Sequence, residues 1–165
     1  MTTAALALAL ALSASAAPAP KKKAPAAPAC KPQKAAKKAV LTYPDGTTAN
    51  LDIVDTPASR ETGLMCRTKL PKNYGMLFVF PQEMDLNFWM KNTLVSLDIV
   101  WIGADKKITV IHDNMKKSTV DTPDNKVATA GGRGEFVLEL PAGAAKERGL
   151  KPGDQLKFDA AIPPL

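Results

Sequence analysis

The chain has 165 residues, with 22 basic against 16 acidic side chains and a formal net charge of +6. Seven lysines and no acidic residue fall within residues 1–38, which leaves residues 39–165 with 15 basic and 16 acidic groups. The length allows one domain with appendages and excludes two ordinary domains. A near-neutral domain argues against a nucleic-acid partner, because nucleic-acid binding concentrates positive charge on a folded face.

The chain opens with a short apolar run of Ala and Leu over residues 4–12. Small residues follow, and Ala14-x-Ala16 and Ser15-x-Ala17 both suit a signal peptidase. The run is shorter than the ~20 apolar residues needed to cross a membrane. We therefore predict a signal peptide over residues 1–17, cleaved near Ala16 or Ala17, and a periplasmic or secreted protein. The alternative is an Ala-rich terminus that is not processed.

Residues 18–38 are built almost entirely from Ala, Pro and Lys, so they have little to bury. This composition predicts a disordered tail, either a solvated spacer or a weak contact for an anionic envelope surface. Cys30 lies in this tail and Cys66 lies in the domain. In an oxidising compartment the two thiols predict one disulfide. The alternative is a buried Cys66 with a free Cys30.

The first part of the domain combines a hairpin and a helix. Apolar segments at 40–43 and 47–54 flank Pro44-Asp45-Gly46, a turn signal. Thr56-Pro57 is a helix start, with Thr as cap and Pro at the first position, and the helix is expected to end near residue 70. Gly63 within it indicates close packing against a neighbouring element.

Further short apolar segments predict strands separated by turns. They are residues 75–80, 86–90, 94–102, 107–111, 136–140 and 155–160, with a short helix over 141–149 and a polar loop over 114–134. Short connections favour antiparallel pairing, because parallel strands need longer crossovers. Residues 39–165 are thus expected to form one mainly β domain (β-rich α+β). Its expected form is a small antiparallel sandwich or partly closed barrel with one main and one short helix.

Three sequence blocks carry a resemblance to a known family. They are Glu61-Thr62-Gly63-Leu64-Met65-Cys66-Arg67, Gly75-Met76-Leu77-Phe78-Val79-Phe80 and Phe88-Trp89-Met90-Lys91-Asn92-Thr93. With residues 97–99 and 136–140, the chain resembles the domain of unknown function 192 family over about residues 40–158. The resemblance implies a compact β-rich fold with a helix, often exported in bacteria. It implies no established activity, so no catalytic residue is transferred.

One candidate binding surface follows from strand alternation in residues 86–91, which places Asn87, Trp89 and Lys91 on one face. An indole beside an ammonium and an amide suits a small anionic or ring-containing ligand. Asp98 falls among apolar residues, so it needs a partner, and Lys91 and Arg67 are the candidates. We predict a pocket lined by Arg67, Trp89, Lys91, Asn92 and Asp98. The alternative is that these are structural ion pairs and that Trp89 belongs to the core.

Three functions remain open at this stage. The preferred one is an exported, non-enzymatic binding or interaction domain for a small ligand or an envelope protein. The second is a small envelope hydrolase that uses two of the carboxylates Glu61, Asp98 and Glu139. The third is a structural accessory of the envelope.

We expect no cofactor and no metal. Met65, Met76 and Met90 lie inside apolar runs, which favours core packing over copper binding. The sequence leaves the catalytic residues, if any, and the oligomeric state open.

Overall fold

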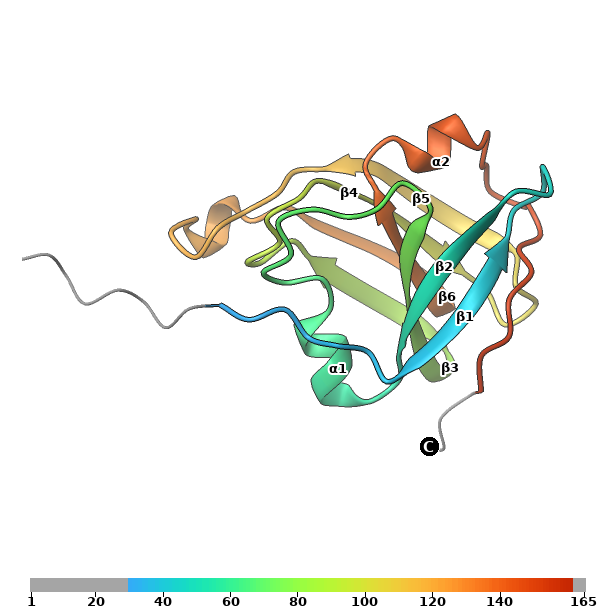
Figure 1. The fold of residues 1–165 in the computed structure, drawn as a ribbon, viewed down its shortest axis with the longest axis horizontal. Coiled ribbons are helices and arrows are strands. Elements are labelled where there is room, and N and C mark those ends of the chain that lie inside the picture. The colour runs from blue at the N-terminus through green and yellow to red at the C-terminus, as the bar shows by residue number, and fades with distance from the viewer. Residues whose placement is uncertain (1–29, 162–165) are drawn as a thin grey trace, which may run out of the picture.

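A computed structural model describes residues 30–161 of the chain, as a six-stranded sheet with the strand order β1-β2-β3-β6-β4-β5 (Figure 1). The elements in chain order are β1 (Lys37–Thr42), β2 (Thr48–Val54), α1 (Pro57–Thr62), β3 (Tyr74–Trp89), β4 (Leu97–Ile102), β5 (Ile108–Met115), the 3-10 helix η1 (Asp124–Lys126), β6 (Thr129–Pro141) and α2 (Ala144–Glu147). The predicted mainly β, α+β class is confirmed.

The predicted hairpin is confirmed as β1 and β2, and Gly46 adopts the positive φ of +80° that its turn requires. β1 begins at Lys37, so the expected boundary between tail and domain at residue 38 falls inside a strand. The predicted signal peptide and most of the predicted tail lie outside the described residues.

Strand pairing differs from the antiparallel expectation at one place. β2 and β3 run parallel, with Asn50 opposite Tyr74 and Val54 opposite Phe78. The reason is the connection of residues 55–73, which contains α1. It is long enough to return the chain to the end of the sheet at which β2 begins, so that β3 can run in the same direction. The sheet is therefore mixed and open. The other pairs, β1–β2, β3–β6, β6–β4 and β4–β5, are antiparallel.

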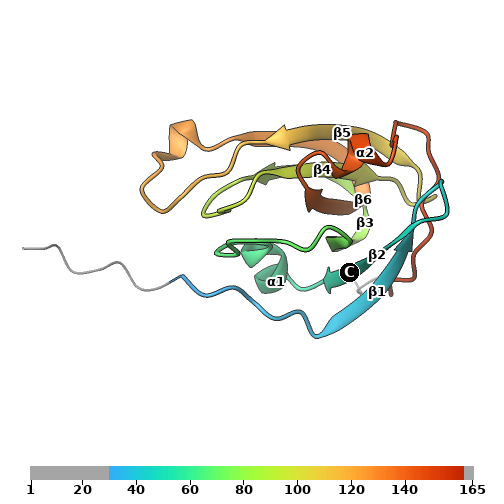
Figure 2. The same ribbon diagram turned by 45° about the horizontal axis from the view of Figure 1, so that its top comes forward.

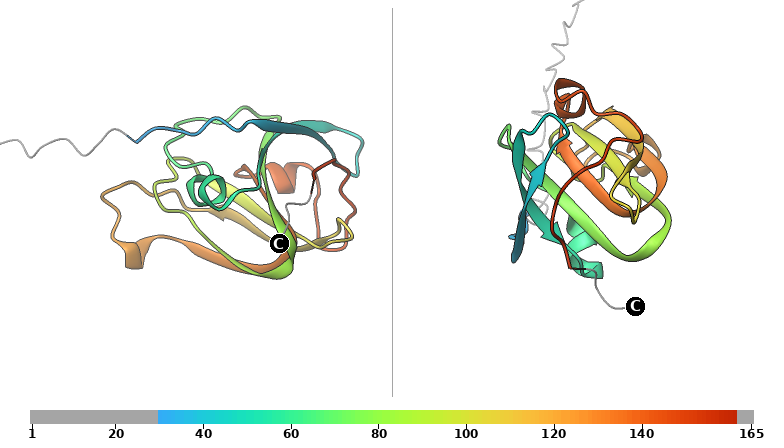
Figure 3. Two further views of the ribbon diagram at one scale, coloured as in Figure 1. Left: turned by 90° about the horizontal axis from the view of Figure 1, so that it is seen from below. Right: turned by 90° about the vertical axis from the view of Figure 1, so that its right-hand side faces the viewer.

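The two strands predicted at 75–80 and 86–90 form one continuous strand, β3 (Figure 3). Its register with β6 shifts between Val79 and Met84, where the strand is irregular. The end of the polar loop predicted over 114–134, including the glycine-rich residues 131–134, is part of β6. A Cβ on Gly132 would lie 2.5 Å from Val110 and 2.7 Å from the Trp101 ring, so this glycine permits the close approach of β6 to side chains of β4 and β5.

The main helix is shorter than predicted. α1 ends at Thr62, and Gly63 follows it with φ of +45°, so Leu64 and Met65 do not continue a helical face. The expected close packing at Gly63 is confirmed, since a Cβ there would lie 3.1 Å from the Phe78 ring. The last predicted strand, 155–160, forms only two isolated bridges, Thr42–Lys157 and Lys107–Gln155.

Two apolar clusters cover the two faces of the sheet. One includes Leu77, Leu138 and Phe158, and the C-terminal segment seals it. The other includes Met76, Phe78 and Trp101, and lies on the face that carries the site described below. α1 and α2 lie at opposite ends of the domain (Figures 1 and 3). No helix among residues 30–161 is long and apolar enough to span a membrane.

Candidate functional site

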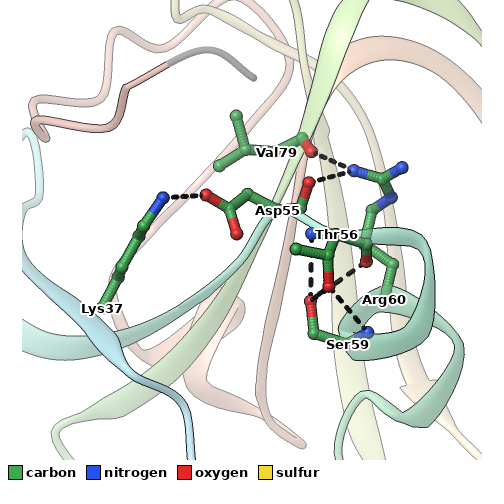
Figure 4. A network of polar contacts seen from close by, with 6 residues as sticks. All are labelled: Lys37, Asp55, Thr56, Ser59, Arg60 and Val79. Carbon is green, nitrogen blue, oxygen red and sulfur yellow. Dashed lines mark hydrogen bonds and ion pairs between the residues drawn. The ribbon is translucent and has the colours of Figure 1, made fainter. Parts of the chain in front are cut away.

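The N-terminus of α1 is fixed by a polar network (Figure 4). Thr56 Oγ1 accepts from the Ser59 N–H at 3.2 Å, and Ser59 Oγ accepts from the Thr56 N–H at 3.1 Å, which is a reciprocal cap. Arg60 donates to the carbonyl oxygens of Asp55 and Val79, at 2.7 and 2.9 Å. Arg60 thereby ties α1 to β3, because Val79 belongs to that strand.

Residues 30–36, here called the N-terminal strap, run past α1 before the chain enters β1 (Figure 2). The predicted disulfide is present and joins Cys30 to Cys66, with the two Cα atoms 5.5 Å apart. Gln33 Nε2 donates to the carbonyl oxygens of Ser59 and Gly63, both at 2.8 Å. The strap therefore satisfies carbonyls at the C-terminal end of α1 and holds residues 59–66 in place.

Between the α1 segment and β3 lies a cavity of about 220 Å³, here called the inner pocket. It is lined by residues 60–65, Phe78, Phe80, residues 87–89, Thr93 and Glu139. Its aromatic rings support one another edge to face, with centroids 4.8 Å apart for Phe78 and Phe88 and 6.4 Å apart for Phe80 and Phe88. The inner pocket thus combines four aromatic side chains with polar and charged groups that could orient a ligand, as small-molecule sites do.

A second cavity of about 310 Å³, here called the outer hollow, shares part of this lining. Both cavities are bordered by Glu61, Thr62, Met65 and Trp89, and the outer hollow adds Lys91 and Asn92. Trp89 is 49% exposed, so its indole is a wall between the two cavities and is not core. Because the two cavities share this border, together they make up the candidate site.

Glu139 is the unusual group of the inner pocket. It lies in β6 opposite Met76 of β3 and Ile99 of β4, and it is only 6% exposed. Its Oε2 atom has no hydrogen-bond partner among the described residues. Burial raises the pKa of Glu139 to about 8, because the charged form loses its hydration. At neutral pH most molecules therefore carry a protonated, uncharged carboxyl here.

Three of the predicted site residues lie together. Lys91 Nζ is 5.4 Å from the centre of the Trp89 ring and forms an ion pair with Asp124. Asn92 follows with a left-handed φ of +52°, and its Oδ1 is buried without a partner among the described residues. The carboxylate candidates Glu61 and Glu139, which the sequence analysis kept apart from this group, line the inner pocket beside Trp89.

Arg67 belongs to a different cluster, beneath the N-terminal strap. Its guanidinium donates to Asp52 at 2.9 Å, and the Tyr74 hydroxyl and Lys38 also donate to Asp52, at 2.8 and 2.5 Å. Burial alone would raise the pKa of Asp52, but the hydrogen bonds from Lys38, Tyr74 and Arg67 together hold it below its usual value. Arg67 is therefore a structural ion-pair partner and does not line the inner pocket or the outer hollow.

Asp98 is also outside the candidate site: it pairs with Leu140, next to Glu139 in β6, but its side chain lies on the other face of the sheet, toward α2. The predicted partners Lys91 and Arg67 are wrong. The fully buried carboxylate of Asp98 accepts hydrogen bonds from backbone N–H groups of Asn114, Gly143 and Ala145, at 2.8, 3.1 and 2.9 Å. Backbone donors satisfy the charge, so no cationic side chain is needed.

Four residues that line the inner pocket were not among the predicted site residues, namely Arg60, Phe80, Phe88 and Thr93. A signal was present for the rings, because Phe78 and Phe80 share one strand face by their spacing of two. No local pattern indicates that β3 continues through residues 81–85 and brings Phe88 against Phe78. Residues 30–161 contain no cluster of three or more His, Cys, Asp or Glu side chains suited to a metal ion.

Comparison with known proteins places the chain in a family. The model of the DUF192 family, described as Uncharacterized ACR, matches residues 28–158. No curated protein matches. A crystal structure of a candidate transcription regulator from Sinorhizobium meliloti 1021 is similar, with 33% identity, a TM-score of 0.63, and coverage of 73% of this chain and 92% of that one.

A protein of unknown function from Novosphingobium aromaticivorans DSM 12444 is also similar, with 31% identity and a TM-score of 0.60. The match covers 73% of this chain and 83% of that one. Both structures are similar in fold to this chain. From its sequence and its fold, the chain belongs to the DUF192 family of uncharacterised proteins.

Proposed function

We propose that this protein is an exported binding domain that holds a small ring-containing ligand in the inner pocket. The observation that carries the proposal is a cavity with aromatic walls and one buried carboxyl that has an unpartnered oxygen. Buried polar groups are normally hydrogen-bonded, and leaving one unpaired costs about 1–3 kcal/mol. A ligand that supplies the missing partner recovers this free energy on binding.

The size of the inner pocket limits the ligand. A cavity of about 150 Å³ lined by apolar side chains is enough for benzene. At about 220 Å³ the inner pocket has room for a single ring with a short polar substituent. The exposed indole of Trp89 offers a stacking surface at the entrance, and the outer hollow gives a larger substituent somewhere to extend.

Export rests on two observations. The apolar run and small residues of 4–17 have the pattern of a signal peptide. The Cys30–Cys66 disulfide favours an oxidising compartment, where such bonds persist. A precursor and a shorter mature form, separated by cell fractionation and distinguished by mass spectrometry, would test cleavage near Ala16 or Ala17.

Binding is tested by saturation-transfer NMR with benzamide and indole as small aromatic probes. We expect transfer to both probes from the parent protein and its loss in Trp89→Ala. Met84→Ala is the matched control, because Met84 is an exposed apolar residue of the same strand outside the pocket lining. Equal transfer in the parent and in Trp89→Ala, or no transfer in either, would contradict the proposal.

A second candidate function has one specific observation in its favour. Glu61 and Glu139 line the same cavity, and burial raises the pKa of Glu139, as a general acid needs. A small hydrolase with paired carboxylates would turn over p-nitrophenyl glycosides and lose activity in both Glu61→Gln and Glu139→Gln. Binding without turnover in the parent protein would leave the binding domain as the function.

The similarity to a candidate transcription regulator raises DNA as a further partner. Residues 39–165 carry one more acidic than basic side chain, which does not favour a phosphate backbone. A role as a structural accessory of the envelope depends instead on residues 18–38. Deleting that segment up to residue 29 should abolish such a role and leave ligand binding in the inner pocket unchanged.

A further inference from the structure

The charged groups around the inner pocket indicate the charge of its ligand, which the size of the cavity does not. Two carboxyl groups, Glu61 and Glu139, line it, and Arg60 is its one cationic side chain among the described residues. Arg60 is committed elsewhere, because its guanidinium donates to two carbonyl oxygens and lies 4.7 Å from the centre of the Phe80 ring. An anionic ligand would therefore find no available cationic side chain in the inner pocket.

The other charged groups nearby are also paired. Lys91 at the outer hollow forms an ion pair with Asp124, and Arg67 is bound to Asp52. The Tyr74 hydroxyl, which belongs to the strand facing Glu139, donates to Asp52 as well. None of these groups donates to Glu139, whose facing residues across the sheet are Met76 and Ile99. A cationic donor for Glu139 has to come from outside the described part of the chain.

We propose that the ligand of the inner pocket is a small aromatic cation, an amine or amidine on a single ring, whose positive end lies against Glu139. This ligand proposal rests on the proposed function and specifies the class of ligand for the same site. Aromatic ring faces carry negative electrostatic potential, so the Phe and Trp walls favour a cation as well as a ring. The anionic ligand expected from the sequence is thereby replaced by a cationic one.

Proton linkage gives this ligand class a signature. A cation stabilises the ionised carboxylate, so its binding releases the proton that Glu139 carries at neutral pH. Affinity for a cation should therefore rise with pH up to about 8 and level off above it. A neutral ligand that accepts a hydrogen bond from the protonated acid should show the opposite trend.

The test is calorimetric titration of the full mature chain with benzamidine, benzamide and benzoate, from pH 6 to pH 9. The three probes share one ring and differ in charge, and benzamidine stays protonated across this range. We expect benzamidine to bind at least tenfold tighter than the other two at pH 8, with an affinity that rises more than tenfold between pH 6 and pH 8. Its binding should release protons, measured in buffers of different ionisation enthalpy.

Glu139→Gln should lose this preference for benzamidine and its pH dependence, and near-UV circular dichroism checks that the variant is folded. Glu135→Gln is the matched control, because it removes a carboxylate from the same strand outside the pocket. If benzamide or benzoate binds as tightly as benzamidine, or if the pH profile is flat, the proposed cationic ligand class is wrong. The proposed binding function of the inner pocket is then unaffected. Failure of all three probes to bind overturns the proposed function itself.

Discussion

Two buried carboxylates on opposite faces of the sheet, in neighbouring strands, show how differently one fold treats the same chemical group. Asp98, near α2, is fully buried and accepts three backbone hydrogen bonds. Glu139, on the α1 side, is almost as buried, yet its Oε2 has no partner among the described residues and its pKa is raised to about 8. The first carboxylate supports structure, and the second is available to a ligand.

The segments around the two carboxyl groups are also held in place by different kinds of contact. Asp98 joins the end of β5 to the segment that begins α2, through donors that belong to the main chain. The α1 end is instead held by long-range tethers, namely the Cys30–Cys66 disulfide and the Gln33 and Arg60 side chains. A site with an open cavity needs such tethers, because it has fewer packed contacts to stabilise it.

The largest expected effect concerns the tether at the α1 end. Cys30 and Cys66 are 36 residues apart, and in the chain-entropy model a loop of that length gives about 3–4 kcal/mol of stability. Cys30→Ser should lower the free energy of unfolding by about that amount in urea titration. Lys31→Ser, a change at the exposed neighbouring residue, is the control and should have no measurable effect. A loss below ~1 kcal/mol would mean that the strap does not stabilise this end.

The α2 end should respond to loss of charge at Asp98. Asp98→Asn replaces an acceptor for three backbone donors by an amide that cannot satisfy all of them without presenting its own buried N–H₂ group. We expect a loss of about 3 kcal/mol, measured by urea unfolding at pH 7. Asp113→Asn changes an exposed carboxylate nearby and should be neutral. A near-neutral result for Asp98→Asn would remove the contrast between the two carboxylates.

Removing the charge of Glu139 should have the opposite effect on stability to Asp98→Asn: at high pH, Glu139→Gln should be more stable than the parent protein. Its pKa is higher in the folded state than in the unfolded state, so folding favours the protonated form. The parent protein should lose stability relative to Glu139→Gln as pH rises from about 4.5 to about 8, by roughly 1.4 kcal/mol for each pH unit in that range. Thermal unfolding of both proteins across this range measures the difference. Parallel pH profiles would show that the carboxyl is not buried unpaired.

The smallest expected effect is at the entrance of the inner pocket. Trp89 is 49% exposed, so Trp89→Ala should change the free energy of unfolding by less than about 1 kcal/mol. Trp101→Ala, at the fully buried indole that donates to the Leu86 carbonyl oxygen, should cost about 3–5 kcal/mol. Similar losses for the two variants would place Trp89 in the core and weaken the proposed binding surface.

Much of the fold could be predicted from local signals. The hairpin around Gly46, the start of α1 at Thr56-Pro57 and the alternation that exposes Trp89 and buries Met90 each depend on a few neighbouring residues. The disulfide followed from the cysteine count, since only one pair is possible. The family followed from sequence blocks that are specific on their own.

The candidate site was predicted less well. Trp89, Lys91 and Asn92 are adjacent in sequence, and the structure keeps them together. Asp98 and Arg67 were assigned to the same pocket because each needs a partner, and sequence does not show where a partner lies. Asp98 finds its donors 16 to 47 residues further along the chain, on backbone atoms that have no sequence signature.

The sequence by itself determined the β-rich class, the turns, the cysteine pair and the family, because periodicity and turn residues act over a few positions. The tertiary structure alone decided the parallel β2–β3 pair, the continuity of β3, the strand at residues 131–134 and the place of Glu139. Those features depend on which strands meet and how closely their layers approach. That choice is made by packing between residues far apart in the chain, and no local pattern contains it.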